Sequence, residues 1–409
     1  MRFILIGSAL VCFAISFKLD LSDPDYNIGG TVKKGWEPLR DLFQENFENE
    51  LDLGASLAIY HQGELVVDLW GGWFDEQKTK PYDNDTLQLV FSTSKGLVAT
   101  AVALCVQRHL LNYTDMVTKY WPEYGQNGKE NTTVADIMSH RAGLPVLSNT
   151  NMSVDDYLDW YSMIHALEKH RPYWVPGTQH GYHALTYGWL AGELVRRVDT
   201  KQRTLGQFIR DEISKQTQSE FYIGLPEEYE RRVSPLVMKP SEQQVLNAEN
   251  NLLLQALTED PLAGLLEFND PKVHRAEIPA GNGITNARSL ARIYASLIGD
   301  SNNSKQLLNA MILKQATKSN TPENELDQIF NTPTTFGMGF QTYGPVFNLL
   351  GPGTFGHNGA GGSIGMASPP LNLSFAYVMN RLDRESSSAI DPRIKPIIDK
   401  ISLIVHNQD

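Results

Sequence analysis

The chain has 409 residues and an ordinary globular composition, with 41% hydrophobic and 20% charged residues. Its formal net charge of −12 at pH 7 argues against a nucleic-acid partner, which requires a basic surface, and no basic cluster interrupts the acidic balance. A chain of this length can bury a large core, and length alone allows two or three domains or one elaborated α/β unit.

The N-terminal segment has the pattern of a targeting signal. Arg2 supplies a positive start, and residues 3–17 form an apolar run that is too short for a comfortable membrane span. We therefore expect a signal peptide over residues 1–17 and a secreted or secretory-pathway protein; the alternative is an uncleaved membrane anchor. Sequons for N-glycosylation support secretion weakly, because a long chain carries several by chance; they occur at Asn84, Asn112, Asn131, Asn151, Asn302 and Asn372.

The first part of the chain predicts a helix, a hairpin and a second helix. Leucines and phenylalanines at helical spacing occupy residues 39–47 behind Pro38. Two β-rich runs then flank Gln62 and Gly63, a pair typical of a hairpin turn. The next helix is apolar and is expected to begin at Ser92. Its interior contains Cys105, which is most simply a buried hydrophobic residue.

The middle of the chain is different from its two ends. Helical patterns and polar loops dominate residues 113–277, whereas short β-prone runs return in residues 336–380. At the C-terminus Asp391 is a plausible N-cap for a last helix with an isoleucine stripe. We therefore predict an α/β domain formed by residues 30–112 and 278–409, a mainly helical region inserted at 113–277, and an active site between the two.

Ser92 and Lys95 stand where the predicted strand passes into the predicted helix. Residues three apart share a helix face, so the two side chains would be neighbours. The positive end of the helix dipole favours an alkoxide over a hydroxyl and disfavours a lysine cation, so Lys95 could accept a proton and activate Ser92 without histidine. The alternative is that Ser92 caps the helix and Lys95 is solvated, because Ser-x-x-Lys arises easily by chance.

Ser363 is a rival nucleophile within Gly-Gly-Ser-Ile-Gly, which matches the Gly-x-Ser-x-Gly elbow of α/β hydrolases. That elbow requires a following helix and a later histidine. Here Pro369, Pro370 and a strand-like run follow, and only His406 remains downstream. We interpret Ser363 as part of a glycine-rich turn.

Metal-binding and nucleotide-binding motifs are absent from the sequence, so no cofactor is expected.

Several ordered segments then point to a known family. Besides Ser-x-x-Lys they are "MSHRAGLP" (138–145), "WVPGTQHGYHALTYGWL" (174–190), "GNGITNARSLARIYASL" (281–297) and "FGHNGAGGSIG" (355–365). With these, the chain resembles the serine β-lactamase and penicillin-binding-protein superfamily over most of its length, from about residue 30 to 405. It is most similar to the branch of class C β-lactamases, related carboxylesterases and animal β-lactamase-domain-containing proteins.

The resemblance implies a serine β-lactamase/transpeptidase-like fold, with an antiparallel sheet flanked by N- and C-terminal helices. It also implies acyl transfer in which Ser92 is the nucleophile, while Lys95 and Tyr182 form the base and Tyr182 protonates the leaving group. The family's oxyanion hole would here consist of the backbone N–H groups of Ser92 and Ala360. Two preorganised donors of this kind contribute strongly, since losing one typically costs roughly 10²–10³ in rate.

Two family motifs are altered where they face substrate. Tyr-x-Asn is Tyr182-His183-Ala184, which lacks the asparagine, and Lys-Thr-Gly is His357-Asn358-Gly359, which lacks the lysine. Substrate contacts are expected from His183, His357, Asn358 and Gly359. Structural roles remain open for Tyr182, His183, His357 and His140.

We therefore expect a serine hydrolase acting on a small ester or amide, more esterase than efficient β-lactamase. The alternative is a catalytically weak or inactive protein with a binding or assembly role. The expected partner is a small-molecule substrate, without nucleic acid or a stable membrane span. The sequence does not indicate the oligomeric state.

Overall fold

A computed structural model describes residues 26–147, 152–239, 252, 261–262, 264–301, 304–343, 350–383 and 391–407. The expected signal peptide over residues 1–17 lies outside the described residues, as do Asn151 and Asn302. None of the described helices is long and apolar enough to cross a membrane.

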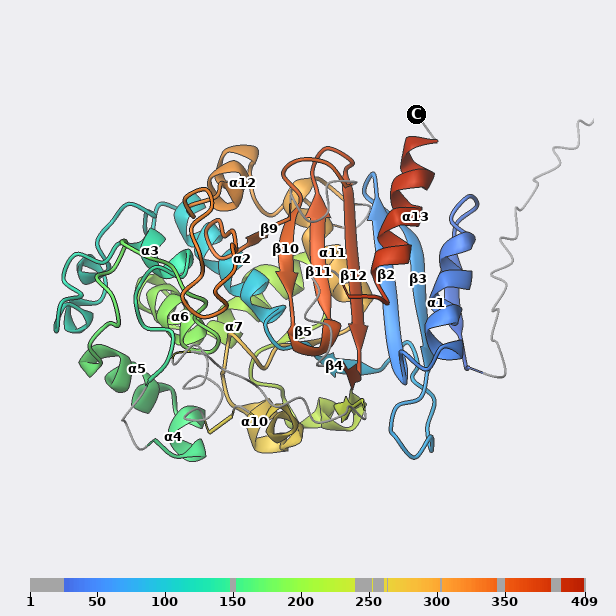
Figure 1. Ribbon diagram of the computed structural model, residues 1–409, viewed down its shortest axis with the longest axis horizontal. Helices are drawn as coiled ribbons and strands as arrows, with labels where there is room; N and C mark the ends of the chain where they lie inside the picture. Colours follow the sequence, from blue (N-terminus) through green and yellow to red (C-terminus); the bar gives the residue numbers. More distant parts are fainter. Residues whose placement is uncertain are drawn as a thin grey trace, which may run out of the picture.

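The largest element is a seven-stranded sheet in which every neighbouring pair is antiparallel (Figure 1). Its strands come from both ends of the chain, so the two ends meet at the β2–β12 pair. In spatial order the strands are β1 (Gly29–Val32), β3 (Glu64–Gly72), β2 (Gly54–His61), β12 (Leu373–Met379), β11 (Ile364–Ser368), β10 (Phe355–Asn358) and β9 (Gln341–Thr342).

The predicted hairpin is confirmed at the β2–β3 turn. Gln62 and Gly63 both have positive φ angles, 52° and 77°, which suits the twist of a two-residue hairpin. The late strands are confirmed as well. The edge strand β1 was not predicted, because four residues that contain two glycines carry little β signal.

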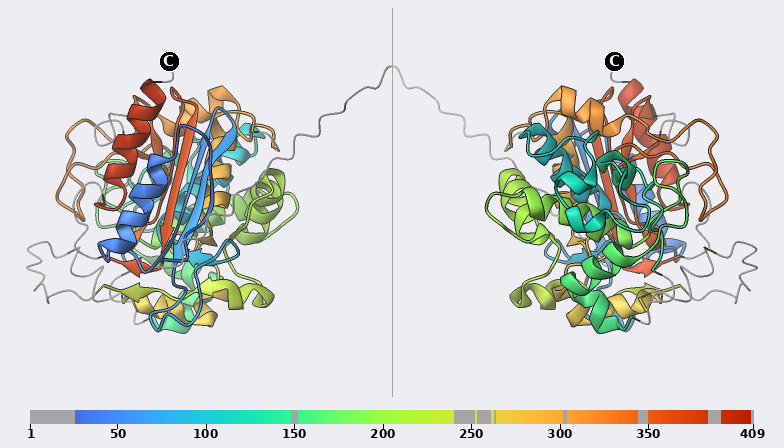
Figure 2. Two further views of the ribbon diagram at one scale, coloured as in Figure 1. Left: turned by 90° about the vertical axis from the view of Figure 1, so that its right-hand side faces the viewer. Right: turned by 90° about the vertical axis from the view of Figure 1, so that its left-hand side faces the viewer.

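Helices cover both faces of the sheet (Figures 1 and 2). Helices α1 (Pro38–Glu48) and α13 (Lys395–His406) lie side by side on one face, and α11 (Ala287–Ile298) lies on the other. Successive residues of β2 point to opposite faces: Leu57 and Ile59 belong to the core under α1 and α13, whereas Ala58 and Tyr60 belong to the larger core. This arrangement confirms the predicted fold class.

The last helix begins later than the sequence predicted. It starts at Lys395, and Asp391 does not cap it; the Asp391 carboxylate instead accepts hydrogen bonds from Arg393. The expected isoleucine stripe is confirmed, since Ile397, Ile398 and Ile401 are buried against the sheet.

Helices gather on the side of the molecule away from α1 and α13 (Figure 1). A π-helical turn, Arg210–Ser214, joins two of them. The domain boundaries at 113 and 277 stay a prediction. The helices are α3 (Val134–Met138), α4 (Val154–Leu158), α5 (Trp160–Lys169), α6 (Thr186–Val198), α7 (Leu205–Ile209), α8 (Lys215–Thr217), α10 (Pro271–Arg275) and α12 (Ala310–Thr317).

Two small sheets accompany the main one. A pair joins β13 (Arg381–Leu382) to β7 (Val237–Met238). A four-stranded sheet has the order β5 (Phe221–Tyr222), β8 (Ile284–Thr285), β4 (Leu87–Leu89) and β6 (Val233–Ser234).

Helix α2 (Ser94–Gln107) lies in the interior and packs against α6, α12 and β10. Every residue of this helix from Ser94 to Val106 is buried, as expected for a helix that is apolar all round. Cys105 is a free, buried thiol, as predicted. The helix begins at Ser94, two residues later than the sequence predicted, so Ser92 precedes it.

Candidate active site

Ser92 lies in the tight turn between β4 and α2. Phe91, just before it, has a φ of 46°, which is unusual for a bulky side chain and typical of turns at functional sites. Two hydrogen bonds tie the turn to segments far away in the sequence. Ser94 Oγ accepts the N–H of Gly283 (2.8 Å), and Thr93 Oγ1 donates to the carbonyl of Ser363 (3.0 Å). The serine is thus held on a rigid support and remains partly exposed.

Lys95 is completely buried beneath that serine. Its Nζ lies 2.9 Å from Ser92 Oγ, 2.6 Å from the Ala184 carbonyl oxygen and 3.0 Å from the Ala280 carbonyl oxygen. Burial lowers the pKa of Lys95 well below its ordinary value. A neutral amine has two N–H groups and one lone pair. With both N–H groups donated to the carbonyls, the lone pair faces Ser92 Oγ and can accept its proton.

Tyr182 borders the same serine. Its hydroxyl forms a hydrogen bond with Ser92, and its ring centre lies 4.8 Å from Lys95 Nζ. Burial raises the pKa of Tyr182, and this effect outweighs the hydrogen bond from Ser92, which lowers it. Tyr182 therefore keeps its proton at neutral pH. The geometry suits Tyr182 as a proton donor, with Lys95 as the first acceptor.

The third predicted motif lies directly against the nucleophile turn. A Cβ atom on Gly359 would come within 2.2 Å of the Val90 carbonyl oxygen, so only glycine fits at this contact. Ala360 follows in a short 3₁₀ turn. Among the described residues, neither the N–H of Ser92 nor that of Ala360 donates to a backbone acceptor. Both donors are available for an oxyanion.

Arg393 supports the loop that carries Ala360. Its Nη2 donates to the Gly361 carbonyl oxygen (2.5 Å), and the guanidinium is 1% exposed. The buried charge is compensated by Asp391 and Asp52, whose carboxylates lie 2.6 Å and 3.2 Å from the guanidinium. A residue near the C-terminal helix thus fixes the loop that carries Ala360.

His357 sits on β10 as predicted, but it does not supply a cation. It is 1% exposed, and burial, followed by the nearby charge of Lys95, lowers its pKa to about 3. Its Nδ1 lies 2.8 Å from the Asn358 carbonyl oxygen, which assigns the ring proton to Nδ1. At neutral pH this histidine does not replace the missing family lysine as a partner for a carboxylate. Asn358, at the end of the same strand, is exposed.

The expected substrate contact at His183 does not fit the structure. Its Nδ1 donates to the Gly181 carbonyl oxygen (2.6 Å), and its Nε2 accepts the N–H of Leu144 (2.9 Å). Both ring nitrogens of His183 are therefore hydrogen-bonded to backbone groups. His140 has a similar role, because its Nδ1 accepts the backbone N–H of His183 (3.0 Å). Both side chains are buried, which supports the structural reading of these two histidines.

Ser363 lacks the surroundings of a nucleophile. It is 2% exposed, and its hydroxyl contacts Met379 Sδ at 3.4 Å instead of a base. The strand β11 follows it directly, where an α/β-hydrolase elbow would have a helix. The prediction of a glycine-rich turn between strands is confirmed.

Comparison with known proteins agrees with this geometry. The sequence pattern of the family described as Beta-lactamase matches residues 43–397. The chain belongs to the Beta-lactamase family. Among characterised relatives, Esterase/beta-lactamase LipL of Mycobacterium tuberculosis is 34% identical over 345 residues, which cover 80% of this chain and 77% of that protein.

Solved structures extend the comparison to nearly the whole chain. A family VIII carboxylesterase superposes with a TM-score of 0.84 at 31% identity, covering 92% of this chain and 99% of that one. A penicillin-binding protein homologue from Caulobacter crescentus has a TM-score of 0.81 at 33% identity, with the same coverage. Our chain is a serine hydrolase of the Beta-lactamase family with an esterase-like character.

Some parts of the site were missed in the sequence. The Ala184 and Ala280 carbonyl groups that orient Lys95 are backbone groups and leave no signal in residue types. Asp327, whose carboxylate accepts the backbone N–H of Tyr182, lies in a polar loop without a recognisable motif. In the part of the chain that the structure describes, no group of His, Cys, Asp and Glu is arranged to hold a metal ion.

Proposed function

We propose that the protein hydrolyses small esters through an acyl-enzyme on Ser92. One observation carries this proposal: the buried Lys95 amine lies 2.9 Å from Ser92 Oγ, with its two other contacts occupied by carbonyl oxygens. A lysine without a nearby carboxylate is costly to bury as a cation, so this position favours the neutral, proton-accepting amine. A protein that only needed a scaffold would have no use for this arrangement.

The first half of the reaction follows from these positions. Lys95 Nζ accepts the Ser92 proton while Oγ forms a bond to the ester carbonyl carbon. The negative charge moves to the carbonyl oxygen, which receives the N–H groups of Ser92 and Ala360. When the carbon–oxygen bond to the alcohol breaks, Tyr182 donates its proton to the leaving oxygen and regains one from Lys95.

The second half releases the acyl group. A water molecule takes the place of the alcohol, gives its proton to the Tyr182–Lys95 pair and attacks the acyl carbon. The bond between Ser92 Oγ and the acyl carbon then breaks, and Ser92 regains its proton from the Tyr182–Lys95 pair. The same two backbone donors stabilise this second tetrahedral intermediate, so one oxyanion site serves both steps.

Short activated esters are expected to be better substrates than cephalosporins. A small ester needs only the nucleophile, the base and the oxyanion donors. A cephalosporin also offers a side-chain amide and a carboxylate, and the family groups for these are here Ala184 and the neutral His357. Losing one charged contact costs roughly 1.5–3 kcal/mol, or about 10- to 100-fold in kcat/KM.

The measurement is the ratio of kcat/KM for p-nitrophenyl acetate to that for a chromogenic cephalosporin. Ser92→Ala protein, prepared in the same way, corrects both rates for background hydrolysis and for contaminating enzymes. A ratio that favours the cephalosporin would contradict the esterase assignment and indicate a β-lactamase.

We also propose that the protein enters the secretory pathway. Arg2 and the apolar residues 3–17 support this, as does the exposure of all four sequon asparagines that the structure describes: Asn84, Asn112, Asn131 and Asn372. Protein expressed in a eukaryotic host should lose apparent mass after treatment with an N-glycosidase. N-terminal sequencing then separates a cleaved signal from a retained anchor. An unchanged mass together with an intact N-terminus on protein recovered from the cytosol would reject the proposal.

A further inference from the structure

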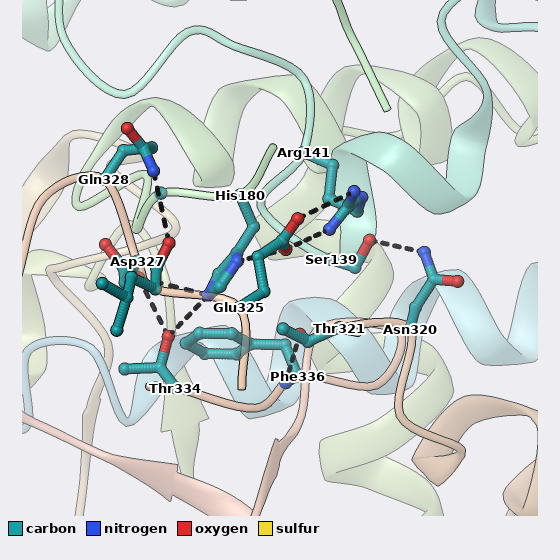
Figure 3. Close-up of polar contacts among 12 residues, drawn as sticks. Ser139, Arg141, His180, Asn320, Thr321, Glu325, Asp327, Gln328, Thr334 and Phe336 are labelled. Carbon is teal, nitrogen blue, oxygen red and sulfur yellow. Dashed lines mark hydrogen bonds and ion pairs between the residues drawn. The ribbon is translucent and has the colours of Figure 1, made fainter. Parts of the chain in front are cut away.

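A largely buried charged cluster, outside the groups that the reaction uses, joins Arg141 and His180 to Glu325 and Asp327 (Figure 3). The two carboxylates belong to residues 325–336, here named the acidic loop. Arg141 Nη1 donates to Glu325 Oε2 (2.5 Å), and His180 Nδ1 lies 2.5 Å from the same oxygen. The side chains of Arg141 and His180 are 8% and 0% exposed, so the acidic loop is attached to the body of the protein by interactions shielded from solvent.

Asp327 is the member of this cluster that reaches Tyr182. Its carboxylate is fully buried. It accepts the backbone N–H of Tyr182 at 3.1 and 3.2 Å, and the Thr334 hydroxyl at 2.9 Å. It also accepts the backbone N–H groups of Ile329 (2.8 Å) and Phe330 (3.2 Å) within its own loop. One carboxylate therefore fixes the backbone of Tyr182 and the shape of the acidic loop together.

The acidic loop also holds the Tyr182 ring. Phe336 stacks on that ring with centres 5.9 Å apart, and Phe330 lies 5.5 Å away. Lys95 Nζ lies 4.8 Å from the ring centre. The direction of the Tyr182 hydroxyl thus depends on two constraints from one loop, a hydrogen bond to its backbone and aromatic contacts to its side chain.

We propose that Asp327 is a positioning residue for Tyr182, and that it acts through hydrogen bonds to N–H groups more than through its charge. This inference rests on the proposed function, in which the Tyr182 hydroxyl must lie within reach of Ser92 and the leaving oxygen. Proton transfer depends steeply on geometry, and a misplacement of about 1 Å costs on the order of 10²-fold in rate.

Two substitutions separate the hydrogen bonds from the charge. Asp327→Ala removes every acceptor and is expected to lower kcat for p-nitrophenyl acetate by about 10- to 100-fold, with little change in KM. Asp327→Asn removes the charge and one acceptor oxygen but keeps the other: its amide oxygen can still accept the N–H groups of Tyr182, Ile329 and Phe330, and its amide nitrogen can donate to Thr334 Oγ1. We expect Asp327→Asn to retain most of the wild-type kcat.

A double-mutant cycle shows whether the effect passes through Tyr182. If Asp327 acts by placing the tyrosine hydroxyl, Tyr182→Phe should cost much less in the Asp327→Ala protein than in the wild type. Asp199→Ala is the matched control: Asp199 is also buried and pairs with Arg203 (2.9 Å) at the far end of α6. It should lower thermal stability while kcat stays near the wild-type value.

Three results would overturn the inference: a normal kcat in Asp327→Ala, equal losses in Asp327→Ala and Asp327→Asn, or additive effects with Tyr182→Phe. If Asp327→Ala does not fold, Thr334→Val replaces it in the test, because this variant removes one hydrogen bond to the Asp327 carboxylate. A normal kcat in Thr334→Val would also overturn the inference. Covalent labelling of the wild-type protein keeps the two proposals apart. If Ser92 is labelled but substitutions at Asp327 leave kcat unchanged, the proposed function stands and only the positioning role of Asp327 is rejected.

Discussion

Ser92→Ala is expected to abolish covalent labelling by a fluorophosphonate and to lower ester turnover by about four to six orders of magnitude. The reason is that Oγ is the atom that bonds to the acyl carbon and the only hydroxyl of the described residues that contacts Lys95 Nζ. The substitution removes one oxygen next to a turn that Ser94 and Thr93 hold in place, so the fold should persist. Intact-protein and peptide mass spectrometry measure the adduct and its position.

Ser363→Ala is the matched control for this experiment. Ser363 is the other serine with a nucleophile-like sequence, and its hydroxyl contacts only the Met379 sulfur. Labelling and turnover should therefore remain at wild-type level in Ser363→Ala. An adduct that survives in Ser92→Ala and disappears in Ser363→Ala would reverse the assignment.

Patterns that depend on local chemistry were readable from the sequence. The hairpin at Gln62 and Gly63, the isoleucine stripe of α13 and the position of Ser92 between a strand and a helix all follow from residue types at fixed spacing. Exact ends were less readable. Asp391 looks like an N-cap, but a buried Arg393 recruits its carboxylate, and a tertiary contact of this kind outweighs a local preference.

The candidate site divides in the same way. Ser92 and Lys95 could be predicted from their spacing at a strand-to-helix boundary, and Tyr182 from the resemblance to a family motif. The environment of the histidines could not be predicted, since burial decides it: His357 was expected to contact substrate, and only the structure shows that burial lowers its pKa to about 3. Asp327 could not be recognised from the sequence, because its carboxylate accepts backbone N–H groups, which every residue type except proline would offer at 182 or 329.

Lys95→Met and Tyr182→Phe are each expected to lower kcat/KM by several orders of magnitude without unfolding the protein. Both residues handle the same proton, so the double variant should be little worse than either single one, as in other catalytic groups that act as a unit. Circular dichroism and thermal melting check that each variant is folded. Steady-state kinetics with one activated ester then give kcat/KM for the wild type, the two single variants and the double variant. A Lys95→Met protein that keeps more than a tenth of the wild-type kcat/KM would show that another group is the base.

The pH profile of kcat/KM gives an independent test of the same assignment. Lys95 must be neutral to accept a proton, so activity is lost as pH falls through its pKa, and burial has moved this pKa well below the ordinary lysine value. Tyr182 must be protonated to donate, so activity is lost as pH rises through its pKa, which burial has raised. The wild type should therefore show a plateau that extends from Lys95's lowered pKa to Tyr182's raised one. Tyr182→Phe should lose the alkaline limb and keep the acid limb, because only the lysine then titrates. An acid limb that persists unchanged in Lys95→Met would instead place the base on a histidine.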